Sequence, residues 1–238
     1  IEELEKGGIK TANIIYIAKN AHIITDSHLE EDGEDSYIGT TKRGNGPAYR
    51  DKYGRRGLRA ENVPELEEYL IDIYEELHNN EGVNVLFEGA QGFGLDIDWG
   101  DYPFVTSSHC TSASALLNGV PPTAVRKVWG VAKPYETYVG AKKFQPEEDI
   151  FNMLRRVGVE YGATTGRARQ CNWMDWGLLT KAINVNGVTD LVFNKMDVLE
   201  QLGHWVVRKG DKKIDFSNQK DMTDWILGQL DSKEINVY

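Results

Sequence analysis

The 238-residue chain has few cysteines: only Cys110 and Cys171, and neither lies in a CxxC pair or at metal-ligand spacing from a histidine. This scarcity predicts reduced thiols, and it argues against a disulfide scaffold or a zinc site built on cysteine. Long apolar runs are lacking too, because none approaches the roughly eighteen residues that span a bilayer, and no stretch resembles a signal peptide. We therefore expect a cytoplasmic protein with no membrane partner.

Basic residues are outnumbered: 27 lysines and arginines face 37 acidic residues, for a formal net charge of −10. This charge argues against nucleic acid as a partner, although a local arginine cluster can still hold a small anion. The hydrophobic content of 40% suffices for one core, so we expect a single domain over residues 1–238. Because the chain starts inside a predicted helix, residues 1–8, and stops on a predicted strand, residues 234–238, we expect a longer protein.

Strands and helices alternate along the rest of the sequence. The predicted strands are residues 12–18, 83–87, 125–132 and 189–193, with a hairpin of residues 204–208 and 212–216. The predicted helices are residues 62–79, 111–117, 173–185 and 221–230, and residues 30–35 and 134–148 are predicted loops. This alternation predicts an α/β fold, with a mostly parallel central sheet, flanking helices, and ligand loops at the carboxyl ends of the strands.

The polar tip that follows the predicted strand 83–87 is a candidate nucleotide site. Small residues at 89, 90 and 92 let the backbone approach a ligand closely. Gln91 offers both an amide donor and a carbonyl acceptor, as reading a purine edge requires, and residues 106–108 add hydroxyls. An ordinary strand-to-loop turn would have the same local pattern, so both interpretations stay open.

Two further loops have the residues that bind anions. Residues 39–47 are glycine-rich and cationic, and Thr41 can bond a phosphate oxygen through its hydroxyl and its N–H. Arg167 and Arg169 place two guanidinium groups on a glycine-hinged loop, and arginine suits bidentate binding of a carboxylate. By itself that loop could equally be a surface turn, and Arg55 could be part of a solvated basic face.

Asp197 follows the predicted strand 189–193. A carboxylate at the carboxyl end of a parallel strand can accept both the N1–H and the 2-amino protons of guanine. Adenine has no such pair of donors. The position therefore favours a guanine nucleotide.

Four blocks occur in order between residues 38 and 199. They read IGTTKRGNGPAYRDKYGRRGLR at 38–59, EGAQGFGLDIDWGDYPFVTSSHCT at 88–111, YGATTGRARQCNWMD at 161–175 and FNKMDVL at 193–199. Together they are much more specific than any one motif. In this combination the sequence resembles the adenylosuccinate synthetase family.

The resemblance implies a P-loop-NTPase-like adenylosuccinate synthetase fold and a ligase. Such an enzyme joins L-aspartate to C6 of IMP through a 6-phosphoryl intermediate, using GTP as co-substrate and Mg²⁺ as cofactor, and acts as a homodimer. In the family pattern a phosphate loop, the catalytic Asp and the catalytic His precede Ile1, and a guanine loop follows Tyr238. The resemblance therefore assigns no catalytic residue here, and it puts the Mg²⁺ ligands outside this sequence.

The resemblance also implies binding roles for individual positions. The substrate nucleotide would be bound by Thr41, Arg55, Gln91, Thr106, Val139 and Arg167. Aspartate would be bound by Thr164, Thr165, Arg167 and Arg169. GTP would be bound by Arg169, Lys195 and Asp197. In the family the arginine that matches Arg55 reaches the nucleotide phosphate across the dimer interface.

The sequence departs from the family pattern at three places. Tyr138 and Ala168 stand where the family has arginines, and Lys142-Lys143 replaces a proline-rich turn. Because of these departures, one alternative is that the protein is a viral-type relative that acts on GMP or dGMP and gives 2-amino-adenylosuccinate. A non-catalytic nucleotide-binding fragment is the second alternative.

Overall fold

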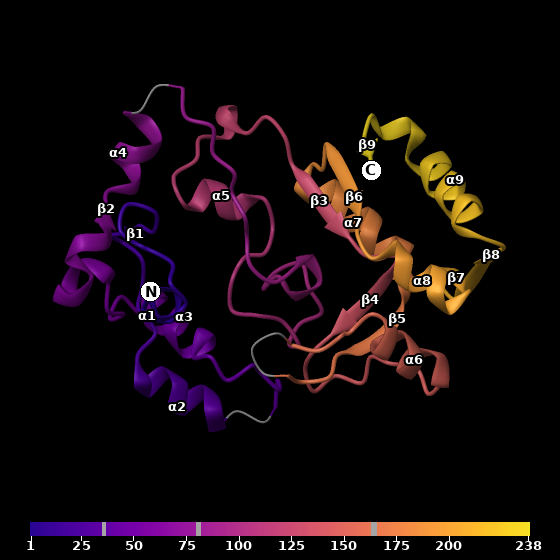
Figure 1. The fold of residues 1–238 in the computed structure, drawn as a ribbon, viewed down its shortest axis with the longest axis horizontal. Coiled ribbons are helices and arrows are strands. Elements are labelled where there is room, and N and C mark those ends of the chain that lie inside the picture. The colour runs from indigo at the N-terminus through magenta and orange to yellow at the C-terminus, as the bar shows by residue number, and fades with distance from the viewer. Residues whose placement is uncertain (35–36, 80–81, 163–165) are drawn as a thin grey trace.

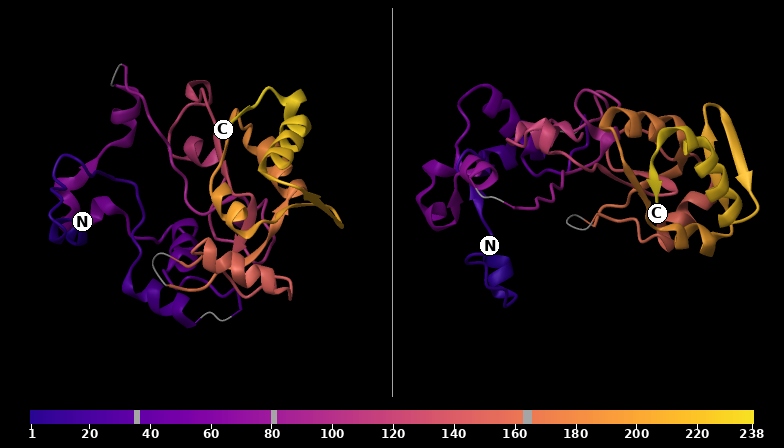
Figure 2. Two further views of the ribbon diagram at one scale, coloured as in Figure 1. Left: turned by 45° about the vertical axis from the view of Figure 1, so that its right-hand side comes forward. Right: turned by 90° about the horizontal axis from the view of Figure 1, so that it is seen from above.

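The computed structural model describes residues 1–34, 37–79, 82–162 and 166–238 (Figure 1). Its larger sheets lie in the C-terminal half, pink through orange to yellow in Figure 1, whereas short elements and loops make up the N-terminal half. The buried hydrophobic cluster runs from Tyr135 to Leu230. Figure 2 shows α1 (Glu2–Lys6) apart from the rest of the chain, and none of its residues is buried.

The N-terminal half corrects several predictions, and of the strand predicted over 12–18 only residues 17–18 form one. After β1 (Ile17–Ala18) come α2 (Asp26–Glu34), α3 (Asn45–Tyr53), the 3-10 helices Ala60–Asn62 and Pro64–Tyr69, β2 (Leu70–Ile71) and α4 (Ile73–His78). The single helix predicted over 62–79 is wrong, because β2 pairs with β1 and the side chain of Asp72 caps a new helix. The loop predicted over 30–35 is wrong up to residue 34, because α2 reaches that far.

The predicted strand 83–87 is also wrong. These residues form no regular element, and Leu86 is 87% exposed. A strand needs a neighbour for its N–H and C=O groups, and in the described part of the chain no strand pairs with this run. The 3-10 helix Phe93–Leu95, α5 (Ala113–Leu117) and the 3-10 helix Pro122–Ala124 follow.

Two sheets organise the C-terminal half. One is entirely parallel, with order β3 (Trp129–Ala132), β6 (Asp190–Phe193), β9 (Asn236–Val237). The other is mixed, with order β4 (Tyr135–Tyr138), β5 (Gln170–Asp175), β7 (Trp205–Lys209), β8 (Lys212–Phe216). Most strand pairs are parallel, as predicted, and the fold is α/β.

Helices flank these sheets, and their bounds test the remaining predictions. They are α6 (Asp149–Val157), α7 (Trp176–Asn186), α8 (Met196–Leu202), α9 (Gln219–Leu230) and a final 3-10 helix Asp231–Lys233. The structure confirms two predicted helices, α5 and α9, and the β7–β8 hairpin. It also confirms strands within 125–132, 189–193 and 234–238. None of the described helices has the length and apolar character that crossing a bilayer requires.

Two predictions around β4 and β5, the start of a helix at residue 173 and the loop over 134–148, are wrong. Trp173 and Trp176 have helical spacing, yet Trp173 belongs to β5, and α7 starts only after Asp175, whose side chain accepts the N–H of Leu178. The predicted connection 134–148 contains β4, which pairs with β5 in antiparallel register. Cross-strand pairing thus overrides the local pattern.

Glu136 in β4 should make stability depend on pH. Burial raises the pKa of its carboxyl from 4.5 to about 7, although the hydrogen bond from the Asp175 N–H and the charge of Arg208 oppose the increase. Because this pKa is raised on folding, the favourable contribution of Glu136 is complete below about pH 4.5 and is lost as the pH rises through about 7. We expect Glu136→Gln to remove that loss, so the melting temperature of the variant relative to wild type should rise across this interval. A constant difference would contradict the assignment.

Candidate active site

Two lysines lie at the same edge of the parallel sheet. Strands β3 and β6 pair in register, with Ala132 opposite Phe193, so Lys133 and Lys195 both follow the carboxyl ends of neighbouring strands. Lys195 is the N-cap of α8 and has left-handed backbone geometry, with φ of 63°. This edge is where ligands bind in open α/β sheets.

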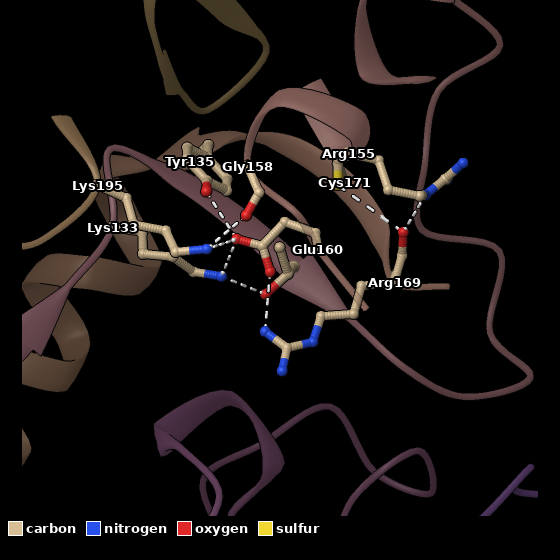
Figure 3. A network of polar contacts seen from close by, with 9 residues as sticks. Lys133, Tyr135, Arg155, Gly158, Glu160, Arg169, Cys171 and Lys195 are labelled. Carbon is tan, nitrogen blue, oxygen red and sulfur yellow. Dashed lines mark hydrogen bonds and ion pairs between the residues drawn. The ribbon is translucent and has the colours of Figure 1, made fainter. Parts of the chain in front are cut away.

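A buried carboxylate joins the two lysines (Figure 3). Glu160, fully buried between α6 and β5, accepts hydrogen bonds at Oε1 from Tyr135 Oη at 2.6 Å, Lys133 Nζ at 3.1 Å and Lys195 Nζ at 3.1 Å. Its Oε2 accepts one from Arg169 Nη1 at 2.8 Å. Three cationic groups thus surround one carboxylate, which leaves an excess of positive charge in an acidic protein.

The pKa values follow from this arrangement. Burial by itself would raise the pKa of Glu160, but the Tyr135 hydroxyl and the charge of Lys133 outweigh it and lower that pKa to about 2. Burial also lowers the pKa of Lys133, while Glu160 opposes the change. Glu160 is therefore a permanent anion near neutral pH rather than a proton carrier.

Arg169 is fixed through its backbone as well as its side chain. Its N–H donates to the carbonyl oxygen of Glu160 at 3.0 Å, and its own carbonyl oxygen accepts from Arg155 Nε. A single antiparallel bridge joins Tyr161 to Ala168. The residues on either side of 163–165 are thereby held together. Thr164 and Thr165, both predicted to bind aspartate, lie outside the described residues.

Arg167 connects this loop to the predicted phosphate loop, more than 120 residues earlier in the chain. Its Nη1 donates to the carbonyl oxygen of Gly39 at 2.9 Å and to that of Thr40 at 3.4 Å. The N–H of Ala141 donates to Ile38, so the segment after Val139 runs beside the same loop. The structure therefore brings Thr41, Val139 and Arg167 into one neighbourhood.

Gly39 must be a glycine in this arrangement. Its φ is 69°, and a Cβ placed there would lie 2.8 Å from the backbone nitrogen of Ala141. At the other end of the loop, the N–H of Gly44 donates to the buried carboxylate of Asp32 at 2.8 Å. Both ends of the loop are anchored, and Thr41 between them is exposed.

The other predicted residues are placed less tightly. Thr106 accepts a hydrogen bond from Asn45 Nδ2 at 2.9 Å, which links the hydroxyl cluster to α3. Gln91 and Asp197 are exposed, and Gln91 has left-handed backbone geometry with φ of 62°. Arg55 is exposed as well, and among the described residues no hydrogen bond or ion pair joins it to Thr41.

The sequence prediction missed Lys133 and Glu160. Lys133 could have been found, because it directly follows a predicted strand, as Asn194 does. Glu160 stands one residue before the third block, and nothing in its local pattern distinguishes it from a surface glutamate. Only the folded chain shows that its carboxylate is buried.

The described residues contain one cluster with possible metal ligands: Asp96, Asp98 and His109. It does not fit Mg²⁺, which prefers octahedral oxygen ligands. The fully buried Asp96 carboxylate already accepts hydrogen bonds from the N–H groups of Asp98, Trp99 and Cys110. It therefore stabilises the loop between residues 96 and 110. His109 and Asp98 instead line an open pocket of about 470 Å³ beside α3, which includes Ser107 of the hydroxyl cluster but none of the residues to which the resemblance assigns a binding role.

These observations define an α/β protein with cationic side chains at one edge of its parallel sheet, beside a loop that carries Thr41 and a loop that carries Arg167 and Arg169. The family model described as adenylosuccinate synthetase matches residues 1–79 and 61–210. The adenylosuccinate synthetase of Carboxydothermus hydrogenoformans is 38% identical over 256 residues, and that of Brugia malayi 37% over 272 residues. The chain belongs to the adenylosuccinate synthetase family.

The matches cover most of this chain and less of the relatives. The two alignments take in 85% and 89% of this chain, but 60% and 61% of those proteins. The chain thus spans about three fifths of the length of these curated relatives.

The fold agrees with solved structures. Fully ligated adenylosuccinate synthetase from Plasmodium falciparum superposes with a TM-score of 0.88 at 25% identity, over 99% of this chain and 77% of that one. The succinoaminodeoxyadenylate synthetase of cyanophage S-2L, bound to dGMP and dATP, gives 0.64 at 19% identity, over 90% and 72%. The second similarity concerns the fold alone.

Tyr135 provides a test of the Glu160 cluster. Tyr135→Phe removes one hydrogen bond to a buried anion, so we expect the free energy of unfolding at neutral pH to fall by about 1.5–3 kcal/mol. Urea denaturation measures it, with Tyr53→Phe at an exposed ring as the matched control. The Glu160 pKa is lowered on folding, so its contribution is present above about pH 4.5 and lost as the pH falls through about 2, and the difference should shrink accordingly. Equal losses in both variants would argue against the cluster.

Proposed function

We propose that the complete protein is a ligase that joins L-aspartate to C6 of IMP, with GTP hydrolysis through a 6-phosphoryl intermediate. Family membership carries this proposal. The proximity of the Thr41 loop to the Arg167 loop supports it, because those loops would hold the nucleotide phosphate and the aspartate carboxylates. The 6-oxygen of IMP is a poor leaving group, so phosphorylation must precede attack by the aspartate amine.

In this proposal the residues of the chain bind and orient the substrates. Thr41, Gln91, Thr106 and Val139 hold the substrate nucleotide, and Arg167 lies between the nucleotide and aspartate. Arg169 contacts aspartate and the triphosphate, while Lys195 and Asp197 lie beside guanine. Bound Mg²⁺ would offset charge during phosphoryl transfer.

A direct assay tests the proposed reaction. The complete protein is incubated with Mg²⁺, GTP, aspartate and either IMP or dGMP, and products are identified by mass spectrometry. Adenylosuccinate formed only from IMP, with one phosphate released per product, supports the proposal. The 2-amino product from dGMP would instead favour the alternative substrate, and GTP binding without any product would indicate a binding protein.

Arg167 should control the affinity for aspartate. Replacing it with alanine removes charged hydrogen bonds worth roughly 1.5–3 kcal/mol, so we expect the KM for aspartate to rise more than tenfold. Arg167→Lys keeps the charge without the planar fork and should recover only part of the affinity. Steady-state kinetics at saturating IMP and GTP measure this effect. Unchanged KM values in both variants would remove Arg167 from the amino-acid site.

Asp197 should select the phosphoryl donor. Adenine would place an acceptor nitrogen against its carboxylate, at a cost on the order of 1–3 kcal/mol, so GTP should be preferred over ATP by roughly tenfold or more. Asp197→Asn should weaken the preference and increase the use of xanthosine triphosphate, because an amide can donate to the 2-oxygen of xanthine. Competition between GTP and ATP in one assay decides the matter, and equal use by wild type would refute the assignment.

We also propose a homodimer in which Arg55 serves the site of the partner subunit. Mixing Arg55→Ala protein with Gln91→Ala protein should then restore part of the activity, because one site of each heterodimer has both residues. Subunit exchange is followed with two affinity tags. Exchange without any recovery would show that the two residues serve the same subunit.

A further inference from the structure

The Glu160 carboxylate is used within the protein and is closed to solvent. Tyr135, Lys133 and Lys195 donate to its Oε1, and Arg169 donates to its Oε2. Because the group is fully buried and keeps its charge, it is neither a general base nor a substrate contact. Its chemical role must act through the residues that it holds.

Three chain segments meet at this carboxylate, and they carry like charges. Lys133 follows β3, Lys195 follows β6, and Arg169 lies just before β5. Without the anion between them, these cations would repel one another, and the side chains of Arg169 and Lys195 would lose their common partner (Figure 3).

Lys195 has a second hydrogen-bond acceptor besides Glu160. Its Nζ also donates to the carbonyl oxygen of Gly158 at 2.6 Å, two residues before Glu160. Its backbone, in the left-handed region, starts α8, on whose first turn Asp197 lies. Lys195 thereby links the Glu160 carboxylate to the start of α8, where Asp197 lies.

We propose that Glu160 is a positioning residue that fixes Arg169 and Lys195 in one arrangement, so that the aspartate side and the GTP side of the site form together. This inference rests on the proposed function, because it takes the roles of these two residues from it. The substrate nucleotide should be little affected, since Thr41, Gln91 and Thr106 have no contact with Glu160 in the described structure.

Steady-state kinetics of Glu160→Gln in the complete protein test the proposal. The amide keeps the size of the side chain but removes the anion, and its NH₂ group would face a lysine or an arginine. We expect the KM values for GTP and for aspartate to rise together, each by roughly tenfold, the size of one charged hydrogen bond. The KM for IMP should stay within about twofold on the same energy scale.

Two further variants separate positioning from loss of stability. Tyr135→Phe removes a donor from the same carboxylate but leaves both cations in place, so its three KM values should stay near those of wild type. Glu160→Asp keeps the charge on a shorter side chain and should restore part of the affinity. Equal weakening of all three substrates in Glu160→Gln and Tyr135→Phe would overturn the proposal, as would wild-type KM values in Glu160→Gln.

A spectroscopic measurement distinguishes this proposal from a failure of the proposed function. In protein labelled with ¹⁵N-arginine, the Arg169 guanidinium signal, assigned by its loss in Arg169→Lys, should show restricted rotation in wild type and free rotation in Glu160→Gln. This readout needs no substrate and holds whatever reaction the protein catalyses. Free rotation in the wild-type protein would overturn the positioning role even if adenylosuccinate is formed.

Discussion

The parallel pairing of β3 with β6 is the constraint on which the site depends. It brings the carboxyl ends of two strands together, and with them Lys133 and Lys195, 62 positions apart in the sequence. Two ammonium groups at one sheet edge are unstable in isolation. The buried Glu160 offsets this repulsion, and a further donation from Arg169 ties the returning loop to the same point.

A second long-range contact extends the site toward the N-terminal half. The guanidinium group of Arg167 lies on the carbonyl oxygens of Gly39 and Thr40, which orients a loop that has little hydrophobic anchoring of its own. Polar contacts thus assemble the two loops, whereas apolar packing assembles the sheets beneath them. Such loops can rearrange around a charged ligand without disturbing the core.

Sequence reasoning succeeded where an element carries its own signals. The hairpin around Lys209-Gly210-Asp211, helix α9 and strand β6 all have local patterns that packing reinforces. It failed where the structure of a segment depends on pairing with a distant strand. Residues 83–87 form no strand, whereas Trp173 joins β5 through pairing with Tyr135. For the site, motif spacing indicated Arg167 and Arg169, but the burial that makes Glu160 important depends on tertiary structure.

Two of the departures from the family pattern, at Tyr138 and at Lys142, are accommodated by local packing. Tyr138 replaces an arginine and is buried, with its ring 5.7 Å from that of Phe144. Gly140 makes room for it, because a Cβ there would lie 2.0 Å from the Tyr138 hydroxyl. Lys142 lies over the same ring, 5.3 Å from its centre, and pairs with Asp101. A positive charge therefore stays beside this loop, although it comes from a different position in the sequence.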